Sequence, residues 1–183
     1  MRSFPFQHQS LCFALALVFA ASLASHQPAA AADSPAEFSK PVIDIGMVVS
    51  DLAKSAAFYT NAIGFKEVSG FKVTAERATE IGLTDNQPAD IRVFALGEGN
   101  LATRIKLMSF PNAPGKRPDQ KFIHSTVGMR YLTLHVTDIN TALKRLETVT
   151  LLGKTPTDLG GGTWIVVFQD PDGNFIELVG PRK

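Results

Sequence analysis

The feature that most constrains the fold is an internal repeat, because one order of strand and helix patterns occurs twice along the chain. In the first copy, alternating apolar residues predict a strand at 43–49, and Asp51 offers an N-cap to a helix that ends at Gly64. In the second copy, segment 131–136 predicts the strand and Asp138 offers the N-cap. The chain is therefore expected to fold as two copies of one small unit.

Further strand patterns follow each predicted helix, and because the copies match, both are predicted to have the order β-α-β-β-β. These patterns lie at 65–73, 91–96 and 102–110 in the first copy and at 164–169 and 174–179 in the second. Runs of adjacent strands predict an α+β fold with largely antiparallel pairing. The copies span about 41–110 and 129–181, and the segment between them, 111–128, has the proline-rich composition of a loop.

The first 32 residues have the pattern of an export signal. Arg2 gives a positive start, 11–24 forms an apolar run of 14 residues, and 29–32 offers small side chains for cleavage. Spanning a bilayer takes roughly 20 apolar residues, so this run is too short for stable membrane insertion. We expect a signal peptide that is cleaved near Ala32, and export to the periplasm or out of the cell. An uncleaved membrane anchor and a buried core helix are the alternatives.

Without this segment, the chain has 151 residues, which is enough for one domain. Residues 33–40 have the composition of a polar tether, and 41–183 form the predicted domain. The 151 residues hold 17 basic and 17 acidic side chains, two histidines and no cysteine. This composition excludes a disulfide framework, a thiol nucleophile, a Cys-ligated zinc site and a three-His metal site. A net charge of zero gives no electrostatic reason to expect binding to nucleic acid.

The segment Asp170–Asn174, with the sequence Asp-Pro-Asp-Gly-Asn, predicts a tight turn between two apolar strands. Proline presets φ, and glycine accepts a positive φ. This turn closes a hairpin and needs no chemical role. In the loop between the copies, Lys116, Arg117 and Lys121 predict a solvated basic face.

Together with the repeat, the helix residues 51–52, 57–59 and 63–65 and the ending 170–178 resemble the vicinal oxygen chelate superfamily. This group includes glyoxalase I, extradiol dioxygenases, fosfomycin resistance enzymes and bleomycin-binding proteins. The resemblance implies a glyoxalase-like fold, in which two βαβββ modules form a half-open, mixed, barrel-like sheet around a cavity. It also implies a small-molecule ligand and, in metal-dependent members, a divalent metal that His and Glu side chains hold in the cavity. Formation of a homodimer by paired modules is a further expectation of the family.

Carried over one position at a time, the resemblance places the family's metal ligands at Asp44, Lys106, Tyr131 and Glu177. Asp44 and Tyr131 each lie seven residues before a helix-capping Asp, where the family usually has His. Glu177 falls on the family's carboxylate ligand and keeps its chemistry. Lys106 occupies the equivalent position at the end of the first copy.

The chemistry of these side chains argues against a tightly bound metal. Charged Lys106 has no lone pair and repels a cation, and the phenol of Tyr131, with a usual pKa near ~10, is a poor ligand. Asp44 and Glu177 remain as ordinary ligands, which is a small set for hard metals that prefer six oxygens. We expect Lys106 to pair with Glu177 or Asp44, because an unpaired buried charge is costly. In the alternative, the four residues fill a structural barrel.

A metal-free mechanism gives these groups other roles. Lys106 would stabilise an oxyanion, Glu177 would act as a base, and Tyr131 would donate a hydrogen bond to the developing charge. His135 shares the strand face of Tyr131 and would shuttle a proton, because its usual pKa lies near ~6.5. A packed histidine with one hydrogen bond is the alternative for His135.

Three functions therefore remain open for the chain. It is an exported lyase-like or dioxygenase-like enzyme acting on a small oxygenated molecule, a non-catalytic binding module of the bleomycin-resistance kind, or a structural barrel. Phe110, Trp164 and Phe175 are candidate walls of a binding cavity. An enzyme requires an accessible cavity that Glu177 reaches, whereas a filled barrel favours the structural role.

Overall fold

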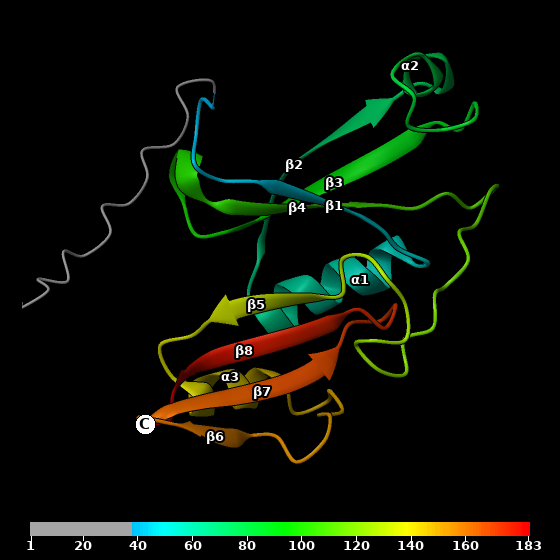
Figure 1. The fold of residues 1–183 in the computed structure, drawn as a ribbon. Coiled ribbons are helices and arrows are strands. Elements are labelled where there is room, and N and C mark those ends of the chain that lie inside the picture. The colour runs from blue at the N-terminus through cyan, green and yellow to red at the C-terminus, as the bar shows by residue number, and fades with distance from the viewer. Residues whose placement is uncertain (1–37) are drawn as a thin grey trace, which may run out of the picture. The chain divides into compact units, whose positions relative to one another are not determined.

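The computed structural model describes residues 38–183, so the predicted export signal and the start of the tether lie outside the described residues. These residues form two four-stranded sheets with short helices (Figure 1). No helix within residues 38–183 has the length and apolar character needed to cross a membrane.

The first sheet belongs to the first repeat and has the strand order β1-β4-β3-β2. Strand β1 runs parallel to β4, and the other neighbours are antiparallel. Asp51 caps the first helix, and Gly64, at a φ of 99°, ends the helical segment in the left-handed conformation that glycine tolerates. In chain order, the elements are β1 (Asp44–Val48), α1 (Leu52–Phe58), η1 (Tyr59–Ile63), β2 (Lys66–Val73), α2 (Ala75–Glu80), β3 (Ala89–Leu96), η2 (Gly99–Leu101) and β4 (Thr103–Met108).

The second sheet repeats this arrangement with the order β5-β8-β7-β6, again with one parallel pair, β5 and β8. Asp138 caps its helix by accepting a hydrogen bond from the Thr141 backbone N–H at 3.0 Å. The predicted α+β class and the two βαβββ modules are therefore confirmed, and residues 38–183 contain no closed barrel. The elements are β5 (Tyr131–His135), α3 (Ile139–Arg145), β6 (Thr157–Gly160), β7 (Thr163–Gln169) and β8 (Phe175–Pro181).

Besides the three-residue turn of η2, a helix and a strand lie where no prediction was made. The six residues of α2 are too few to show a helical period, although Thr74 caps them by accepting a hydrogen bond from the Arg77 N–H at 3.2 Å. All four residues of β6 are exposed, so this strand lacks the alternation that marks a half-buried strand.

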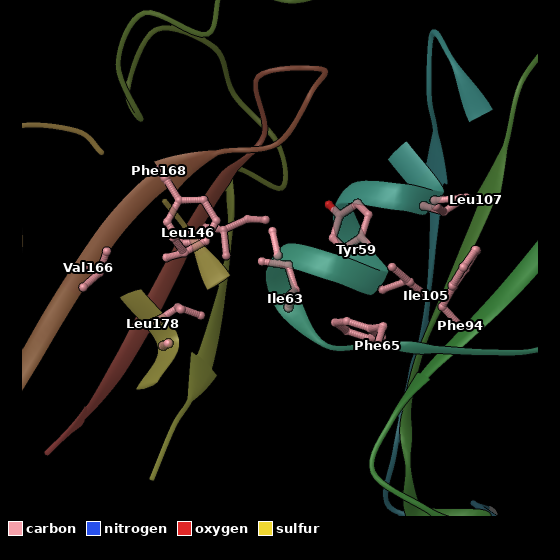
Figure 2. Packing of buried hydrophobic residues seen from close by; sticks show 14 of the residues in the cluster. Tyr59, Ile63, Phe65, Phe94, Ile105, Leu107, Leu146, Val166, Phe168 and Leu178 are labelled. Atoms are coloured by element: carbon pink, nitrogen blue, oxygen red, sulfur yellow. The ribbon is translucent and has the colours of Figure 1, made fainter. Parts of the chain in front are cut away.

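One hydrophobic core joins the two sheets through α1 and η1. Figure 2 shows Tyr59 and Ile63 between first-sheet side chains, such as Ile105, and second-sheet side chains, such as Phe168. Tyr59 also packs edge-to-face against Phe65, with ring centroids 5.9 Å apart. The core therefore occupies one face of each sheet and leaves the other face outside it.

The predicted Asp-Pro-Asp-Gly-Asn turn closes the β7–β8 hairpin and also reaches the N-terminal end of α1. Asp172 accepts hydrogen bonds from the Ser50 backbone N–H at 3.2 Å and from the Ser55 hydroxyl at 3.4 Å. Asp170 accepts one from the Tyr59 hydroxyl at 2.8 Å. The two aspartates are only 5% and 8% exposed, and buried carboxylates are tolerated where donors surround them. The turn therefore connects the second module to the first.

Arg117, in the loop between the modules, strengthens the same contact. Its guanidinium donates to Asp172 at 2.9 Å and to the Ser50 hydroxyl at 3.0 Å. The expectation of a purely solvated basic face thus misses an ion pair to a buried carboxylate. Burial, together with the charge and hydrogen bond of Asp170, raises the pKa of Tyr59 well above its usual value, so its hydroxyl stays protonated and remains a donor.

The Tyr59→Phe substitution is expected to destabilise the protein by about 1–3 kcal/mol, because it leaves the buried Asp170 carboxylate one donor short. Urea unfolding measures the change in the free energy of unfolding. Tyr131→Phe is the matched control, because it removes a hydroxyl from a half-exposed ring and should change that free energy by less than about 0.5 kcal/mol. Equal losses in the two variants would contradict the role given to the Tyr59 hydroxyl.

Candidate functional site

Strand alternation gives each sheet a core face and an opposite face, here called the open face. Lys106 on β4 and Glu177 on β8 each lie between two residues that enter the core. Asp44 on β1 and Tyr131 on β5 also alternate with strand residues that pack against the core. All four positions singled out by the family resemblance therefore lie on open faces.

An ion pair joins two of these positions on the first sheet. The Lys106 ammonium lies 3.1 Å from a carboxylate oxygen of Asp44, and the Lys40 ammonium lies 3.9 Å from the other oxygen. The hydrogen bond from Lys106 lowers the pKa of Asp44, partly against its desolvation, and the charges of Lys106, Lys40 and Arg104 act in the same direction as that bond. Of the two partners expected for Lys106, the structure shows Asp44 in contact.

The other predicted site residues lie on the second sheet. Glu177 accepts a hydrogen bond from the Thr133 hydroxyl at 2.8 Å, directly across the parallel β5–β8 pair. Tyr131 begins β5 with half of its surface exposed, and His135 ends the same strand, also exposed. Glu177, Tyr131 and His135 therefore share one pair of strands, whereas Asp44 and Lys106 belong to the other sheet.

These five side chains do not line one common cavity. Tyr131 lines a cavity of about 230 Å³ beside β1, and His135 lines one of about 320 Å³ beside α3. Glu177 lines neither of these cavities, nor two others found within residues 38–183, so it lines none of the four. Within this chain, the predicted base and the predicted oxyanion-stabilising group are therefore on separate sheets.

The largest of the four cavities, about 640 Å³, covers the open face of the first sheet. Asp44 and Lys106 form one charged part of its wall, and Asp85 is the third charged residue of the lining among the described residues. Its volume lies within the range of roughly 300–1,000 Å³ that is typical of small-molecule sites. Most of the remaining wall is apolar and comes from the four strands, α2 and the loop after β4, including Val48, Phe71, Val73, Ala89, Ile91, Met108 and Phe110.

The three aromatic residues proposed as cavity walls have different surroundings. Phe110 lines the 640 Å³ cavity, and Phe175 lines the 230 Å³ cavity. Trp164 instead packs against the core, and the Arg182 guanidinium lies 4.7 Å from the centre of its ring. Two of the three aromatic side chains therefore border cavities.

A divalent metal of the family kind does not fit the donors on the first sheet. Within residues 38–183, no three His, Cys, Asp or Glu side chains are grouped so that they could hold one ion. The ammonium of Lys106 occupies a family ligand position and is already in contact with the Asp44 carboxylate. A cation brought to Asp44 would meet that ammonium at close range, where like charges repel strongly.

Sequence reasoning missed the part of the cavity that α2 and its following loop contribute. Ala78 of α2 and the residues Ile81 and Leu83 just after it line the cavity. The local signals for this helix were the Thr74 cap and an acidic residue, Glu76, in the first turn. Both signals are short-range, and neither indicates which face of the sheet the helix will cover.

Comparisons with known proteins agree with this architecture. A model of the Glyoxalase/Bleomycin resistance protein/Dioxygenase superfamily matches residues 42–178. A glyoxalase family protein from Bacillus cereus has a similar structure, with a TM-score of 0.66, 20% sequence identity and coverage of 82% of this chain and 100% of its own. A glyoxylase/bleomycin resistance protein/dioxygenase domain from Frankia sp. EAN1pec has a TM-score of 0.55 and 19% identity, and covers 76% of this chain and 90% of its own. No curated protein matches the sequence.

At these identities the two solved structures show a common fold, and the family model extends the likeness to the sequence of nearly the whole described domain. The repeated βαβββ modules and the open faces of their sheets agree with that assignment. The chain belongs to the Glyoxalase/Bleomycin resistance protein/Dioxygenase superfamily.

Proposed function

We propose that this protein binds a small oxygenated organic molecule in the 640 Å³ cavity, with the Asp44–Lys106 ion pair in place of the family metal. The observation that carries the proposal is the 3.1 Å contact between the two charges in the wall of that cavity. A filled barrel would leave no such space, so the cavity favours binding over a purely structural role.

The ammonium of Lys106 partly replaces a metal, because it also places a positive charge next to an oxygen atom of the ligand. A Lys ammonium has three donor hydrogens, and the contact with Asp44 uses one of them. The others remain for carbonyl, hydroxyl or carboxylate oxygens of the ligand. Asp44 keeps the charge of Lys106 balanced when the cavity holds no ligand, which limits the cost of burying it.

Catalysis by a lyase-like or dioxygenase-like reaction is the second candidate, and it depends on pairing with a second copy of the chain. Among the described residues, β1 pairs only with β4 and β5 only with β8, so each has an unpaired edge. Unpaired edges favour association through added strand pairing. A homodimer built on these edges would bring an Asp44–Lys106 pair toward the Glu177 and Tyr131 of the other copy, and would give Glu177 a substrate to act on.

Replacing Lys106 by Met is expected to raise the pKa of Asp44 toward its ordinary value near ~3.9, because its strongest hydrogen bond disappears. NMR titration of the Asp44 carboxyl carbon measures this pKa. The Lys40→Met control removes a more distant cation and should raise the pKa less. An unchanged pKa in the Lys106 variant would contradict the ion pair.

The same ion pair has a defined pH dependence. The pKa of Asp44 is lowered in the folded protein, so the pair's contribution to stability is complete above the unfolded-state pKa near ~3.9. That contribution is lost as the pH falls through the lower, folded-state pKa. The Lys106→Met variant should therefore show a smaller loss of stability over this acidic window than the wild type.

A thermal-shift screen of EDTA-treated protein with small carboxylates, diols and catechols tests the proposed function. We expect at least one compound to raise the melting temperature without metal, and added Mn²⁺ not to increase the shift. Stabilisation that requires a divalent metal would overturn the proposal.

Metal binding by variants supplies a second test of the same point. Lys106→Glu should gain bound Mn²⁺ in equilibrium dialysis, because it replaces an ammonium with a carboxylate next to Asp44. Lys116→Glu makes the same charge change in the loop between the modules and should gain none. Equal metal content in the wild type and in Lys106→Glu would contradict the proposal that Lys106 prevents metal binding.

We also propose that residues 1–32 direct export and are then removed. The protein recovered from the periplasm or the culture medium should begin near Asp33 when its N-terminus is sequenced. Recovery of the chain with an intact Met1 in the membrane fraction would support an uncleaved anchor instead.

A further inference from the structure

The two modules differ most at the connection between their second and third strands. In the second module, Gly161 and Gly162 alone join β6 to β7. In the first module, residues 74–88 join β2 to β3 and contain α2, which lies beyond the ends of these two strands (Figure 1). Side chains of this longer connection line the cavity on the open face, and residues 74–88 are here called the α2 cover. Within residues 38–183, only the first sheet has such a cover. Because only one of the two matching modules has this cover, we infer that it serves a function of the open face of the first sheet.

The cover and the strands present apolar side chains to the cavity that remain exposed. Val48, Phe71, Ile81 and Leu83 are between 46% and 72% exposed, and all four line this one cavity. Single exposed apolar residues are ordinary, but several that converge on one hollow are typical of a ligand site. Because burying apolar surface stabilises a complex, the body of the ligand should be apolar.

Among residues 38–183, Lys106 is the one cation that lines the cavity, and two further cations lie next to the Asp44 carboxylate in its wall. The ammonium groups of Lys106 and Lys40 lie 3.1 Å and 3.9 Å from the Asp44 carboxylate oxygens, and Arg104 is the neighbour of Asp44 on β4. Arg104 shares the open face with Lys106 and lies in register with Asp44 across the β1–β4 pair. Its buried Nε has no hydrogen-bond partner among residues 38–183. Asp85 is the other acidic residue of the lining and is exposed in the loop after α2.

We propose that the cavity takes an amphipathic organic monoanion, whose apolar body lies beneath the α2 cover and whose carboxylate lies at Lys106 and Arg104. This inference rests on the proposed function and narrows its ligand class. The carboxylate accepts the remaining hydrogens of Lys106 and offers an acceptor to the Arg104 guanidinium. Lys106 then contacts the ligand and Asp44 at the same time, so that it keeps its ion pair with Asp44 when the ligand binds.

Gly46 allows the cavity to be closed without disturbing the fold. It lies on β1 in register with Lys106, and its missing side chain leaves space in the wall. A Cβ placed there would meet only the Met108 methyl, at an ordinary contact distance of 3.7 Å. Gly46→Leu should therefore fill the space beside Lys106 while it keeps the strand intact.

The test uses three probes with one apolar body and different heads: octanoate, octanol and octylammonium, each below its aggregation concentration. Isothermal titration calorimetry of the wild-type protein should give a dissociation constant for octanoate at least tenfold lower than for the other two. Arg104→Met should weaken octanoate binding at least tenfold and leave octanol binding unchanged. Gly46→Leu should abolish octanoate binding, and a melting temperature close to that of the wild type shows that this variant is folded.

The contrary results separate this inference from the proposed function. Octanol or octylammonium binding as tightly as octanoate would overturn the anion preference, and equal octanoate binding by Gly46→Leu would overturn the location. If no probe binds but the screen yields a metal-independent ligand that Gly46→Leu rejects, the monoanion class is wrong and the function stands. If neither the probes nor the screen yields a ligand, both proposals fail.

Discussion

The contact between the carboxylate turn of the second module and the first helix of the first module is the interaction on which the rest of the structure depends. Asp170 and Asp172 are buried, and their donors come from Tyr59, from Ser50 at the start of α1 and from Arg117 in the connecting loop. Because the turn, the first helical segment and the connecting loop are three separate parts of the sequence, the contact orients both sheets around one core. That packing buries the core faces of both sheets, so a ligand site can form only on the open faces.

On the open face of the first sheet, the Asp44–Lys106 pair determines which chemistry is available. At a position where the family resemblance places a metal ligand, this chain has the ammonium of Lys106 in contact with the Asp44 carboxylate. Such a wall still attracts oxygen atoms, but it does so by hydrogen bonding and charge rather than by coordination. The α2 cover then adds apolar surface near the charged wall, which makes an amphipathic anion a better match than a small polar chelator.

The sequence predicts the repeat, the two helix caps and the pairing of Lys106 with a carboxylate, because each depends on local patterns or on a side chain's own charge and donors. It does not predict α2 or β6, since six helical residues show no period and an exposed strand shows no alternation. Nor does it distinguish Asp44 from Glu177 as the partner of Lys106. That choice depends on which sheet each strand joins, and only the tertiary arrangement places Lys106 and Glu177 on separate sheets. The buried role of the Asp170 turn is likewise long-range, because its partners Ser55 and Tyr59 lie more than a hundred residues away in the sequence.

The central claim is that an ammonium group has taken the position of the family's metal ion. Paramagnetic broadening of NMR signals by Mn²⁺ tests it most directly, because the effect is confined to nuclei near a bound ion. The account predicts that substoichiometric Mn²⁺ leaves the signals of Asp44, Lys106 and Glu177 as sharp as those of residues elsewhere in the domain. Selective broadening of Asp44 and Glu177 at such concentrations would show a metal held between them and would contradict the account.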